Sequence, residues 1–287
     1  MEIIKDPTKM QGVALSLKNQ GKTIAIVPTM GFLHDGHLAL VDKAKEIADI
    51  VITSLFVNPK QFAPNEDFDS YPRDFEHDQA LLKAKNVDYL FAPDALDMYP
   101  IGFSTSLHIS GITEVFEGTT RPTHFDGVAL VVLKLLEISQ CNFAIFGQKD
   151  YQQTLVVKRM IADLNLPVQM VICPIYREPS GLAMSSRNRY LTDEEKEKAS
   201  IIFLALEAAK KAIAQGERKR KIINSIILSN IKTIPNIKID YINTARAESL
   251  ETPDEFFPGE EIVMLVAVYV GRTRLIDNAL IKIPTAL

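Results

Sequence analysis

The sequence predicts an α/β protein, in which a parallel sheet with helices on both faces precedes a smaller α+β part with an antiparallel sheet. Up to about residue 174, strand-length apolar runs alternate with longer segments of helical period. Such continuous apolar runs are typical of parallel strands buried on both faces. After Pro174, two long helical segments come first and three strand-length runs follow. This change places a boundary near residue 175 and predicts two domains, 1–175 and 176–287.

Each element of the first domain follows from its local pattern. TIAIVP (23–28) is a buried run of strand length, HLALVDKAKEIAD (37–49) is amphipathic with a helical period, and IVITSLFV (50–57) is rich in β-branched residues. The same alternation predicts helices over 74–86, 127–139 and 150–164, and strands over 87–93, 104–110, 141–147 and 168–174.

The second domain is predicted from helix-capping signals and from three runs that favour strands. Thr192, with Glu195 three residues later, forms a capping box that begins a helix over 192–216, and Gly216 ends that helix. A second helix is expected over 217–231, and antiparallel strands over 237–245, 261–270 and 273–281.

The composition excludes several classes of protein. The 287 residues are 24% charged with a formal net charge of -4, which argues against a nucleic-acid-binding protein. Cys141 and Cys173 lie far apart in apolar segments, so we expect reduced, buried thiols and no disulfide framework. The sequence opens with no signal-peptide pattern, and no apolar run reaches the roughly 20 residues that cross a bilayer, so we expect a cytoplasmic protein without membrane contact.

Two histidines follow the first predicted strand in PTMGFLHDGH. His34 and His37 lie at the start of a predicted helix, where free backbone N–H groups favour anions. Gly31 and Gly36 allow the backbone to approach a ligand closely. Two imidazoles in this position can donate hydrogen bonds to a phosphate, whereas chance spacing with core packing is the alternative. A zinc site fits less well, because the sequence has no HExxH pattern.

Polar side chains also follow two other predicted strands. FVNPKQF places the amides of Asn58 and Gln61 after one strand, although an Asx-capped turn would explain them as well. FGQKDYQQ follows another strand and offers Lys149 to a phosphate, with either Gln152 or Gln153 on the same side. Because ligands bind beyond the carboxyl ends of strands in open α/β sheets, we expect these side chains to share one pocket.

A fourth polar segment, GLAMSSRNRYL, lies after the domain boundary. Ser185, Ser186 and Arg187 supply hydrogen-bond donors that suit an oxyanion such as a triphosphate. A helix-capping loop is the alternative, but a donor-rich loop between domains is more often functional.

The order and spacing of these motifs resemble those of one family. PTMGFLHDGH is similar to the HxGH signature of nucleotidyltransferases and class I aminoacyl-tRNA synthetases, and MSSRN stands in the place of their second, KMSKS-like loop. A larger set resembles the pantothenate synthetases, also called pantoate–β-alanine ligases, from about residue 3 to about residue 281: VPTMGFLHDGH, FVNPKQF, YPRD, RPTHFDGV, FGQKDYQQ, GLAMSSRNRYL and RLIDN.

The resemblance implies a fold and an activity. The fold would be a Rossmann-like domain that binds nucleotide and pantoate, 1–175, and a C-terminal lid domain, 176–287. The enzyme would join (R)-pantoate to β-alanine with ATP, through a pantoyl-adenylate, and would release AMP and pyrophosphate. Members of the family are typically homodimers and use Mg²⁺, and neither nucleic acid nor membrane is expected as a partner.

The resemblance also assigns roles to residues. The catalytic donors to the phosphates would be His34, His37, Lys149, Ser185, Ser186 and Arg187, with His37 in the position of the proton donor. ATP would be bound by these residues and by Met30, Gly31, Phe32, Leu33, Asp35, Gly36, Gly147, Gln148, Asp150, Tyr176 and Met184. The acid and amine substrates would contact Met30, Asn58, Gln61, Arg121, His124 and Gln153, and Asp78 would be associated with Mg²⁺.

Three positions depart from the pattern of the family. Gln148 stands where Glu is usual, Lys60 where Met is common, and His77 where an acidic residue often precedes Asp78. The loss of acidic side chains at 77 and 148 bears on how a metal ion would be held.

Two other functions fit part of the pattern. A nucleotidyltransferase that acts on a phosphate monoester would share the HxGH signature, but such a substrate would call for cationic residues in place of Gln61 and Gln153. A non-enzymatic nucleotide-binding module would use the same donors without turning ATP over, and it would leave the two glutamines unexplained.

Overall fold

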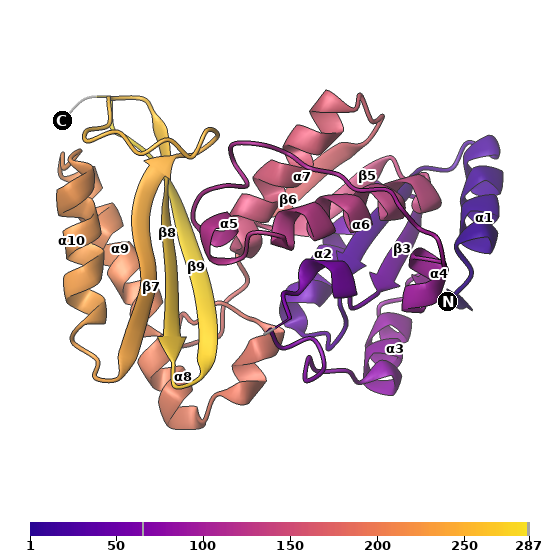
Figure 1. Ribbon diagram of the computed structural model, residues 1–287, viewed down its shortest axis with the longest axis horizontal. Coiled ribbons are helices and arrows are strands. Elements are labelled where there is room, and N and C mark those ends of the chain that lie inside the picture. The colour runs from indigo at the N-terminus through magenta and orange to yellow at the C-terminus, as the bar shows by residue number, and fades with distance from the viewer. Residues whose placement is uncertain (65, 286–287) are drawn as a thin grey trace. The chain divides into compact units, whose positions relative to one another are not determined.

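The computed structural model describes residues 1–64 and 66–285 (Figure 1). The chain divides into two compact units, Met1–Pro174 and Ile175–Leu287. The strands of the first unit are β1 (Glu2–Ile4), β2 (Ile24–Thr29), β3 (Ile50–Leu55), β4 (Tyr89–Phe91), β5 (Phe143–Gly147) and β6 (Gln169–Cys173). Its helices are α1 (Pro7–Asn19), α2 (Asp35–Ile47), α3 (Phe75–Ala84), α4 (Ala95–Met98), α5 (Glu117–Thr120), α6 (His124–Ser139) and α7 (Tyr151–Asp163), with short 3₁₀ turns η1 (Pro59–Gln61) and η2 (Gln148–Asp150). The second unit contains η3 (Ser186–Tyr190), α8 (Asp193–Ala199), α9 (Ile201–Ala214), α10 (Arg220–Ile231), β7 (Ile237–Arg246), β8 (Glu261–Val270) and β9 (Thr273–Lys282).

The first unit is built on a parallel sheet whose strand order, in the described residues, is β1-β4-β3-β2-β5-β6. β2 pairs with β3 along its whole length, from Ile24 opposite Ile50 to Thr29 opposite Leu55, and it pairs with β5 on its other side. Successive side chains of a strand point to opposite faces, and residues 24–27 of β2 are all buried. Both faces of the sheet are therefore covered, as the continuous apolar run predicts.

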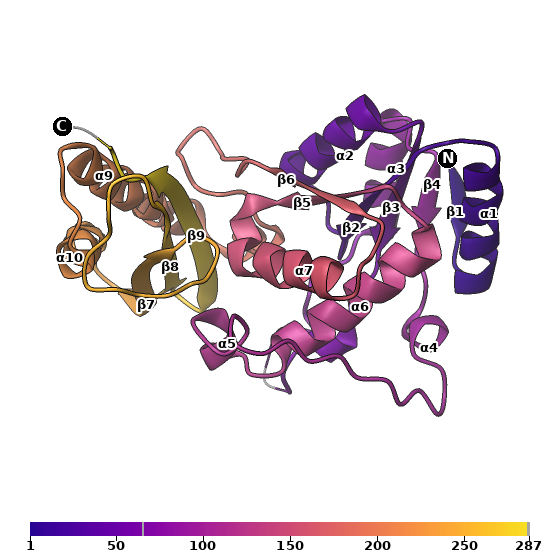
Figure 2. The same ribbon diagram turned by 90° about the horizontal axis from the view of Figure 1, so that it is seen from above.

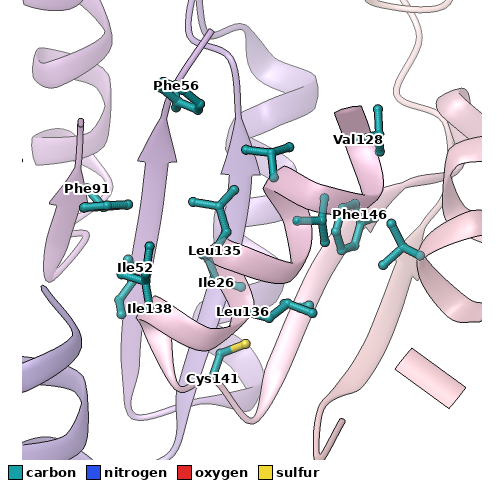
Figure 3. Close-up of a cluster of buried hydrophobic side chains, with 14 of the residues drawn as sticks. Ile26, Ile52, Phe56, Phe91, Val128, Leu135, Leu136, Ile138, Cys141 and Phe146 are labelled. Carbon is teal, nitrogen blue, oxygen red and sulfur yellow. The ribbon is translucent and has the colours of Figure 1, made fainter. Parts of the chain in front are cut away.

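Helices cover the two faces through separate apolar cores. On one face, Ile24 and Ile26 of β2 share a core with residues of α1, α6 and α7. Leu135 of α6 belongs to this core (Figure 3). On the other face, Ala25 and Val27 share a core with residues of α2 and α3. Figure 2 shows α2 and α3 on one side of the sheet and α6 and α7 on the other. The predicted parallel sheet with helices on both faces is confirmed.

The second unit is an antiparallel sheet of order β7-β8-β9, with α9 and α10 packed on one face (Figure 1). Alternate residues of the central strand β8, Met264, Val266 and Val268, share a core with Ile213 of α9 and Ile227 of α10. The predicted antiparallel sheet is confirmed. In the part of the chain that the structure describes, no helix is both long enough and apolar enough to cross a membrane.

The structure differs from the sequence prediction in several places, and the short helices α4 and α5 are among the elements that the sequence analysis does not predict. The sequence analysis does not predict β1 and α1, although the carboxylate of Asp6 caps α1 by accepting the N–H of Lys9 at 2.8 Å. The segment 104–110, expected as a strand, forms none, because its apolar residues Leu107 and Ile109 pack instead on the core that contains α6. The helix expected over 192–216 is divided into α8 and α9.

Gly127 of α6 lies directly against the turn η1. The Nδ2 atom of Asn58 donates to the carbonyl oxygen of Gly127 at 3.0 Å. A Cβ atom at Gly127 would overlap the carbonyl oxygen of Lys60 and would lie 2.7 Å from the Cα atom of Gln61. The absence of a side chain therefore lets the turn after β3 rest on the helix.

Gly127→Ala is expected to destabilise the protein by about 1–3 kcal/mol, the usual cost of overpacking, even though alanine favours a helix by up to ~1 kcal/mol relative to glycine. Gly12→Ala in α1 is the matched control, because a Cβ atom there meets nothing within 4 Å. The control should keep or raise stability. Urea unfolding of both variants measures the difference, and equal effects would contradict the close packing inferred at Gly127.

Candidate active site

The carboxyl ends of β2, β3 and β5 lie side by side in the sheet. From β2 the chain continues to β3 and β4 on one side, and later it places β5 and β6 on the other side of β2. The strand order therefore reverses between β2 and β5. Open parallel sheets bind ligands at such a point, because the loops after the two strands separate there. The segments after these three strands, 30–37, 56–61 and 148–153, carry most of the predicted site residues.

The loop after β2 turns sharply at Gly31 and Phe32. Both residues have positive φ, 86° and 51°, which a phenylalanine rarely adopts. The carboxylate of Asp78, in the first turn of α3, accepts the N–H of Phe32 at 2.8 Å and the N–H of Leu33 at 2.6 Å. Burial raises the pKa of Asp78, and the two backbone hydrogen bonds oppose that rise. Successive N–H groups around one anion stabilise a turn of this kind.

His34 is the N-cap of α2, and its ring lies 4.0 Å, between centroids, from that of His37. The Nδ1 atom of His37 accepts the backbone N–H of His34 at 3.3 Å. Burial, and after it the charge of Lys149, lowers the pKa of His34 from 6.5 to about 4. Burial, followed by His34 and Lys149, also lowers the pKa of His37. Both imidazoles are therefore neutral at pH 7, and His37 carries its proton on Nε2.

Lys149 lies in the turn η2 after β5, and its charge acts on both histidines. Its Nζ atom is 3.4 Å from Oδ1 of Asp150, and the lysine side chain is 21% exposed. Asp150 occupies the N-cap position of α7 without a capping hydrogen bond from its side chain. Two neutral imidazoles and an ammonium group thus meet at the reversal point, an arrangement that suits a polyanion.

The amides of Asn58 and Gln61 lie after β3 in one network. The Nδ2 atom of Asn58 donates to Oε1 of Gln61 at 3.2 Å. The Nε2 atom of Gln61 is 3.0 Å from Sδ of Met30, which lies in the loop after β2. Both amides are buried. The network joins the loops after two neighbouring strands and directs the N–H groups of Gln61 toward Met30.

Arg121 and His124, around the start of α6, hold the backbone of Gln61. Arg121 binds both carboxylate oxygens of Glu66, at 2.5 and 2.6 Å, and its Nη1 atom is 3.1 Å from Nε2 of His124. The Nδ1 atom of His124 is 2.9 Å from the carbonyl oxygen of Gln61. Because a carbonyl only accepts, Nδ1 carries the proton and Nε2 accepts from the guanidinium.

Of the two glutamines in the first turn of α7, the fold itself uses one. The side-chain Nε2 of Gln152 donates to the carbonyl oxygens of Ile112 and Val115 at 2.7 and 2.8 Å, and its Oε1 accepts the N–H of Glu117 at 3.1 Å. The side chain of Gln153 is partly buried and makes no hydrogen bond to the residues that the structure describes. Gln153 is therefore the glutamine with hydrogen-bonding capacity left for a ligand.

The donor-rich segment of the second unit forms a turn braced within that unit. The N–H of Met184 donates to the carbonyl oxygen of Tyr176 at 3.0 Å. Ser185 begins η3, and its hydroxyl oxygen accepts the N–H of Arg187 at 3.3 Å. Ser186 is the next residue of the same turn and is buried. The five predicted residues of this unit thus belong to one local structure.

Asp277, from the RLIDN motif in β9, braces this turn from the side. Its two oxygens accept hydrogen bonds from Arg177 at 2.7 and 3.0 Å, and it is 4% exposed. The guanidinium of Arg177 also lies 4.7 Å from the ring centroid of Phe203. The Nδ2 atom of Asn188 donates to Glu178 at 2.9 Å. The late motif therefore has a structural role that its sequence did not indicate.

No group of three or more histidine, cysteine, aspartate or glutamate side chains in the described residues is placed to hold a metal ion. Both oxygens of Asp78 already accept backbone N–H groups. The described residues therefore do not form a protein-held magnesium site. The association of Asp78 with Mg²⁺ stays a prediction, whereas its role in the loop after β2 was not predicted.

The structure places the predicted site residues in two groups, one in each unit. The first-unit group lies in or against the loops at the reversal point: Met30, Gly31, Phe32, Leu33, His34, Asp35, Gly36, His37, Asn58, Gln61, Asp78, Arg121, His124, Gly147, Gln148, Lys149, Asp150 and Gln153. The second group is Tyr176, Met184, Ser185, Ser186 and Arg187. Sequence reasoning missed Glu66, Tyr99, Gly127 and Asp277, of which only Gly127 had a local signal, a glycine inside a helical pattern.

The fold and the site define the class of protein: a nucleotide-binding α/β protein with an HxGH segment at the reversal point of its sheet.

Comparisons with known proteins define the family. The model of the family described as pantoate-beta-alanine ligase matches residues 2–280. Pantothenate synthetase from Caldicellulosiruptor saccharolyticus is 48% identical over 287 residues, covering 99% of this chain and 100% of that protein. The crystal structure of the enzyme from Thermus thermophilus has a TM-score of 0.92 at 40% identity, covering 99% of this chain and 100% of that chain. Pantoate-beta-alanine ligase from Francisella tularensis, complexed with beta-gamma ATP and beta-alanine, has a TM-score of 0.79 at 35% identity, covering 98% of this chain and 97% of that chain. The chain belongs to the pantoate–β-alanine ligase family and is an enzyme of this class.

The neutral His124 makes stability depend on pH. Burial, and after it Arg121, lowers the pKa of His124 from 6.5 to about 4. Between these values the unfolded chain binds a proton that the folded chain does not, so the free energy of unfolding falls as the pH falls from about 6.5 to about 4.

His124→Gln keeps an N–H donor for the carbonyl oxygen of Gln61 but removes this titration. Between pH 7 and pH 5 the wild type should lose up to about 2 kcal/mol more stability than the variant. Urea unfolding at the two pH values measures this difference. Identical pH dependence in the two proteins would contradict a neutral His124.

Proposed function

We propose that this protein joins (R)-pantoate to β-alanine in two steps, the first of which consumes ATP. In the first, a carboxylate oxygen of pantoate attacks the α-phosphorus, the bond to the β-phosphate oxygen breaks, and pyrophosphate leaves with that electron pair. In the second, the amine nitrogen of β-alanine attacks the carbonyl carbon of the pantoyl-adenylate and loses a proton, and AMP leaves. The observation that carries the proposal is the meeting of two imidazoles and Lys149 at the reversal point, in a chain that matches the ligase family from residue 2 to residue 280.

The first step needs donors for the charge that grows on pyrophosphate. The Nε2–H of His37 is a neutral donor, and Lys149 supplies a positive charge beside it. The buried Nδ1 atom of His34 has no hydrogen-bond partner in the described residues, which supports a ligand group in contact with it. Phosphates would raise the pKa of both histidines, so the proton-donor role assigned to His37 is favoured once ATP is bound.

The acid substrate calls for side chains that recognise hydroxyl and carboxylate groups. Gln61 directs amide N–H groups toward Met30, and Gln153 has unused hydrogen-bonding capacity. Neutral amides favour a carboxylic acid with hydroxyl groups over a phosphate monoester, which argues against the alternative nucleotidyltransferase activity. Arg121 and His124 would act on the substrate through the backbone of Gln61, because their side chains bind Glu66 and that backbone.

The second unit would complete the site as a lid. Ser185, Ser186 and Arg187 would donate to the phosphates, and Tyr176 and Met184 would contact adenosine. Exclusion of water matters because the adenylate would otherwise hydrolyse. The amide-forming step then needs no new catalytic group, since holding the reactants together can supply effective molarities of up to about 10⁵–10⁸ M.

The proposal includes three properties implied by family membership. Mg²⁺ would arrive on ATP, held mostly by phosphates and water. The enzyme would act as a homodimer in the cytoplasm. The Francisella tularensis relative is complexed with beta-gamma ATP and beta-alanine, which supports these two molecules as substrates here.

Exchange of labelled pyrophosphate into ATP tests the order of the steps. The proposal expects exchange with pantoate alone, before β-alanine is added, because the adenylate forms first. A phosphate monoester would not replace pantoate. If ATP bound without pantoate-dependent exchange and without AMP production when both substrates were present, the protein would be a nucleotide-binding module and the proposal would be wrong.

Lys149→Ala should slow adenylate formation by on the order of 10²-fold or more, the scale of a single lost oxyanion donor. Lys43→Ala is the matched control, because Lys43 makes a solvated ion pair with Glu46 at 2.9 Å on the surface of α2. Single-turnover kinetics measures the step directly. Adenylate formation at wild-type speed in Lys149→Ala would contradict the role of this lysine.

A further inference from the structure

Tyr99 is connected to the predicted pantoate site through hydrogen bonds that the reaction scheme does not use. Tyr99 directly follows α4 in the chain. Its hydroxyl group donates to Oδ1 of Asn58 at 2.8 Å. Tyr99 is half-buried, and burial raises the pKa of its phenol, so the group remains a donor at neutral pH. Asn58 is 1% exposed, so this contact is shielded from water.

The partners of Asn58 fix which end of its amide is which. The backbone N–H of Lys60 donates to Oδ1 at 3.2 Å, and the carbonyl oxygen of Gly127 accepts from Nδ2 at 3.0 Å. An N–H only donates and a carbonyl only accepts, so a flipped amide would place two like groups face to face on both sides. The phenol of Tyr99 is the third partner, and it reinforces the same orientation.

The orientation of Asn58 sets the orientation of Gln61. Because Nδ2 of Asn58 faces Gln61 at 3.2 Å, the atom that Gln61 presents to it must be the acceptor Oε1. The Nε2 atom of Gln61 then lies on the other side, 3.0 Å from the thioether sulfur of Met30, which is a weak acceptor. A substrate oxygen beside Met30 would accept a hydrogen bond from Nε2 of Gln61. If the amide of Gln61 were flipped, its carbonyl oxygen would face that oxygen and repel it.

The ring of Tyr99 is held from several sides, so its hydroxyl has a defined position. The ring of Phe103 meets it edge-on at 5.2 Å between centroids, and the ring of Phe56, just after β3, lies at 6.2 Å. The ammonium groups of Lys60 and Lys134 lie 5.1 and 6.0 Å from the centroid of the ring. Cations over an aromatic face are stabilised by the quadrupole of the ring. Lys60, which departs from the pattern of the family, thus packs on Tyr99.

We propose that Tyr99 is a positioning residue of the pantoate site, which acts through Asn58 to keep the N–H donors of Gln61 directed at the acid substrate. The inference rests on the proposed function, because it names the substrate that these donors recognise. Tyr99 does not touch the reacting atoms. Its effect is therefore expected on the binding of one substrate and not on the chemical step.

Tyr99→Phe tests this role, since it removes the hydroxyl and keeps the ring between its neighbours. Loss of one neutral hydrogen bond changes an equilibrium by about 2- to 12-fold. The KM for pantoate should rise by about that factor in the pyrophosphate-exchange assay. In steady-state synthesis with both substrates, kcat and the KM values for ATP and β-alanine should remain within about twofold. Tyr89→Phe is the matched control, because the hydroxyl of Tyr89 makes no hydrogen bond to described residues of the same unit.

A double-substitution cycle tests whether Tyr99 acts through Asn58. In an Asn58→Ala background, Tyr99→Phe should have no further effect on the KM for pantoate. An unchanged KM for pantoate in folded, active Tyr99→Phe would overturn the inference, and so would an equal rise in all three KM values or a fall in kcat alone. If the wild type itself showed no pantoate-dependent exchange, the proposed function would fail first. If the wild type showed pantoate-dependent exchange and Tyr99→Phe had the same KM for pantoate, only the role proposed for Tyr99 would be wrong.

Discussion

The contact of the Asp78 carboxylate with the N–H groups of Phe32 and Leu33 is the constraint on which the rest of the site depends. A side chain at positive φ costs on the order of 1–3 kcal/mol and persists only where the surroundings hold it. Here a buried anion holds it, so the chain leaves β2 in a turn and begins α2 at His34. The raised pKa of Asp78 reflects the burial of that anion. This turn leads directly into the segment that places both imidazoles near Lys149.

The charge of the site follows from the same geometry. Crowding His34, His37 and Lys149 together would be unfavourable if all three were cationic, and the lowered pKa values of the histidines show how the fold avoids it. The cluster therefore combines the ammonium group of Lys149 with two neutral rings, which would gain a proton more readily beside a polyanion. In the proposed reaction, binding of phosphates would be linked to uptake of protons, so the donors would be strongest when charge has to be stabilised.

The sequence predicts those parts of the structure that depend on local patterns. The apolar run of β2 and the position of His34 at a helix start are of this kind, as is the order of elements that makes the sheet parallel. Contacts between distant residues left no such signal. Asp78 is separated by 46 residues from Phe32, and Tyr99 by 41 from Asn58. The segment 104–110 has an alternating pattern like that of a strand, but its partners decide its structure: Leu107 and Ile109 pack on a helix-covered core.

Gln61 is a proposed substrate-binding residue whose side chain the first unit already holds in place. Its amide is oriented by Asn58, its carbonyl oxygen is held by His124, and its Cα atom rests against Gly127. Asn58 lies in the turn after β3, and His124 and Gly127 lie in the helix α6. The three residues and Gln61 form one network of contacts. Residues that share a network do not act independently, so the loss of one contact also weakens the hold of the others on the amide. The orientation of Gln61 is thus a property of the folded unit, established before any substrate arrives, and a ligand does not have to order this side chain on binding.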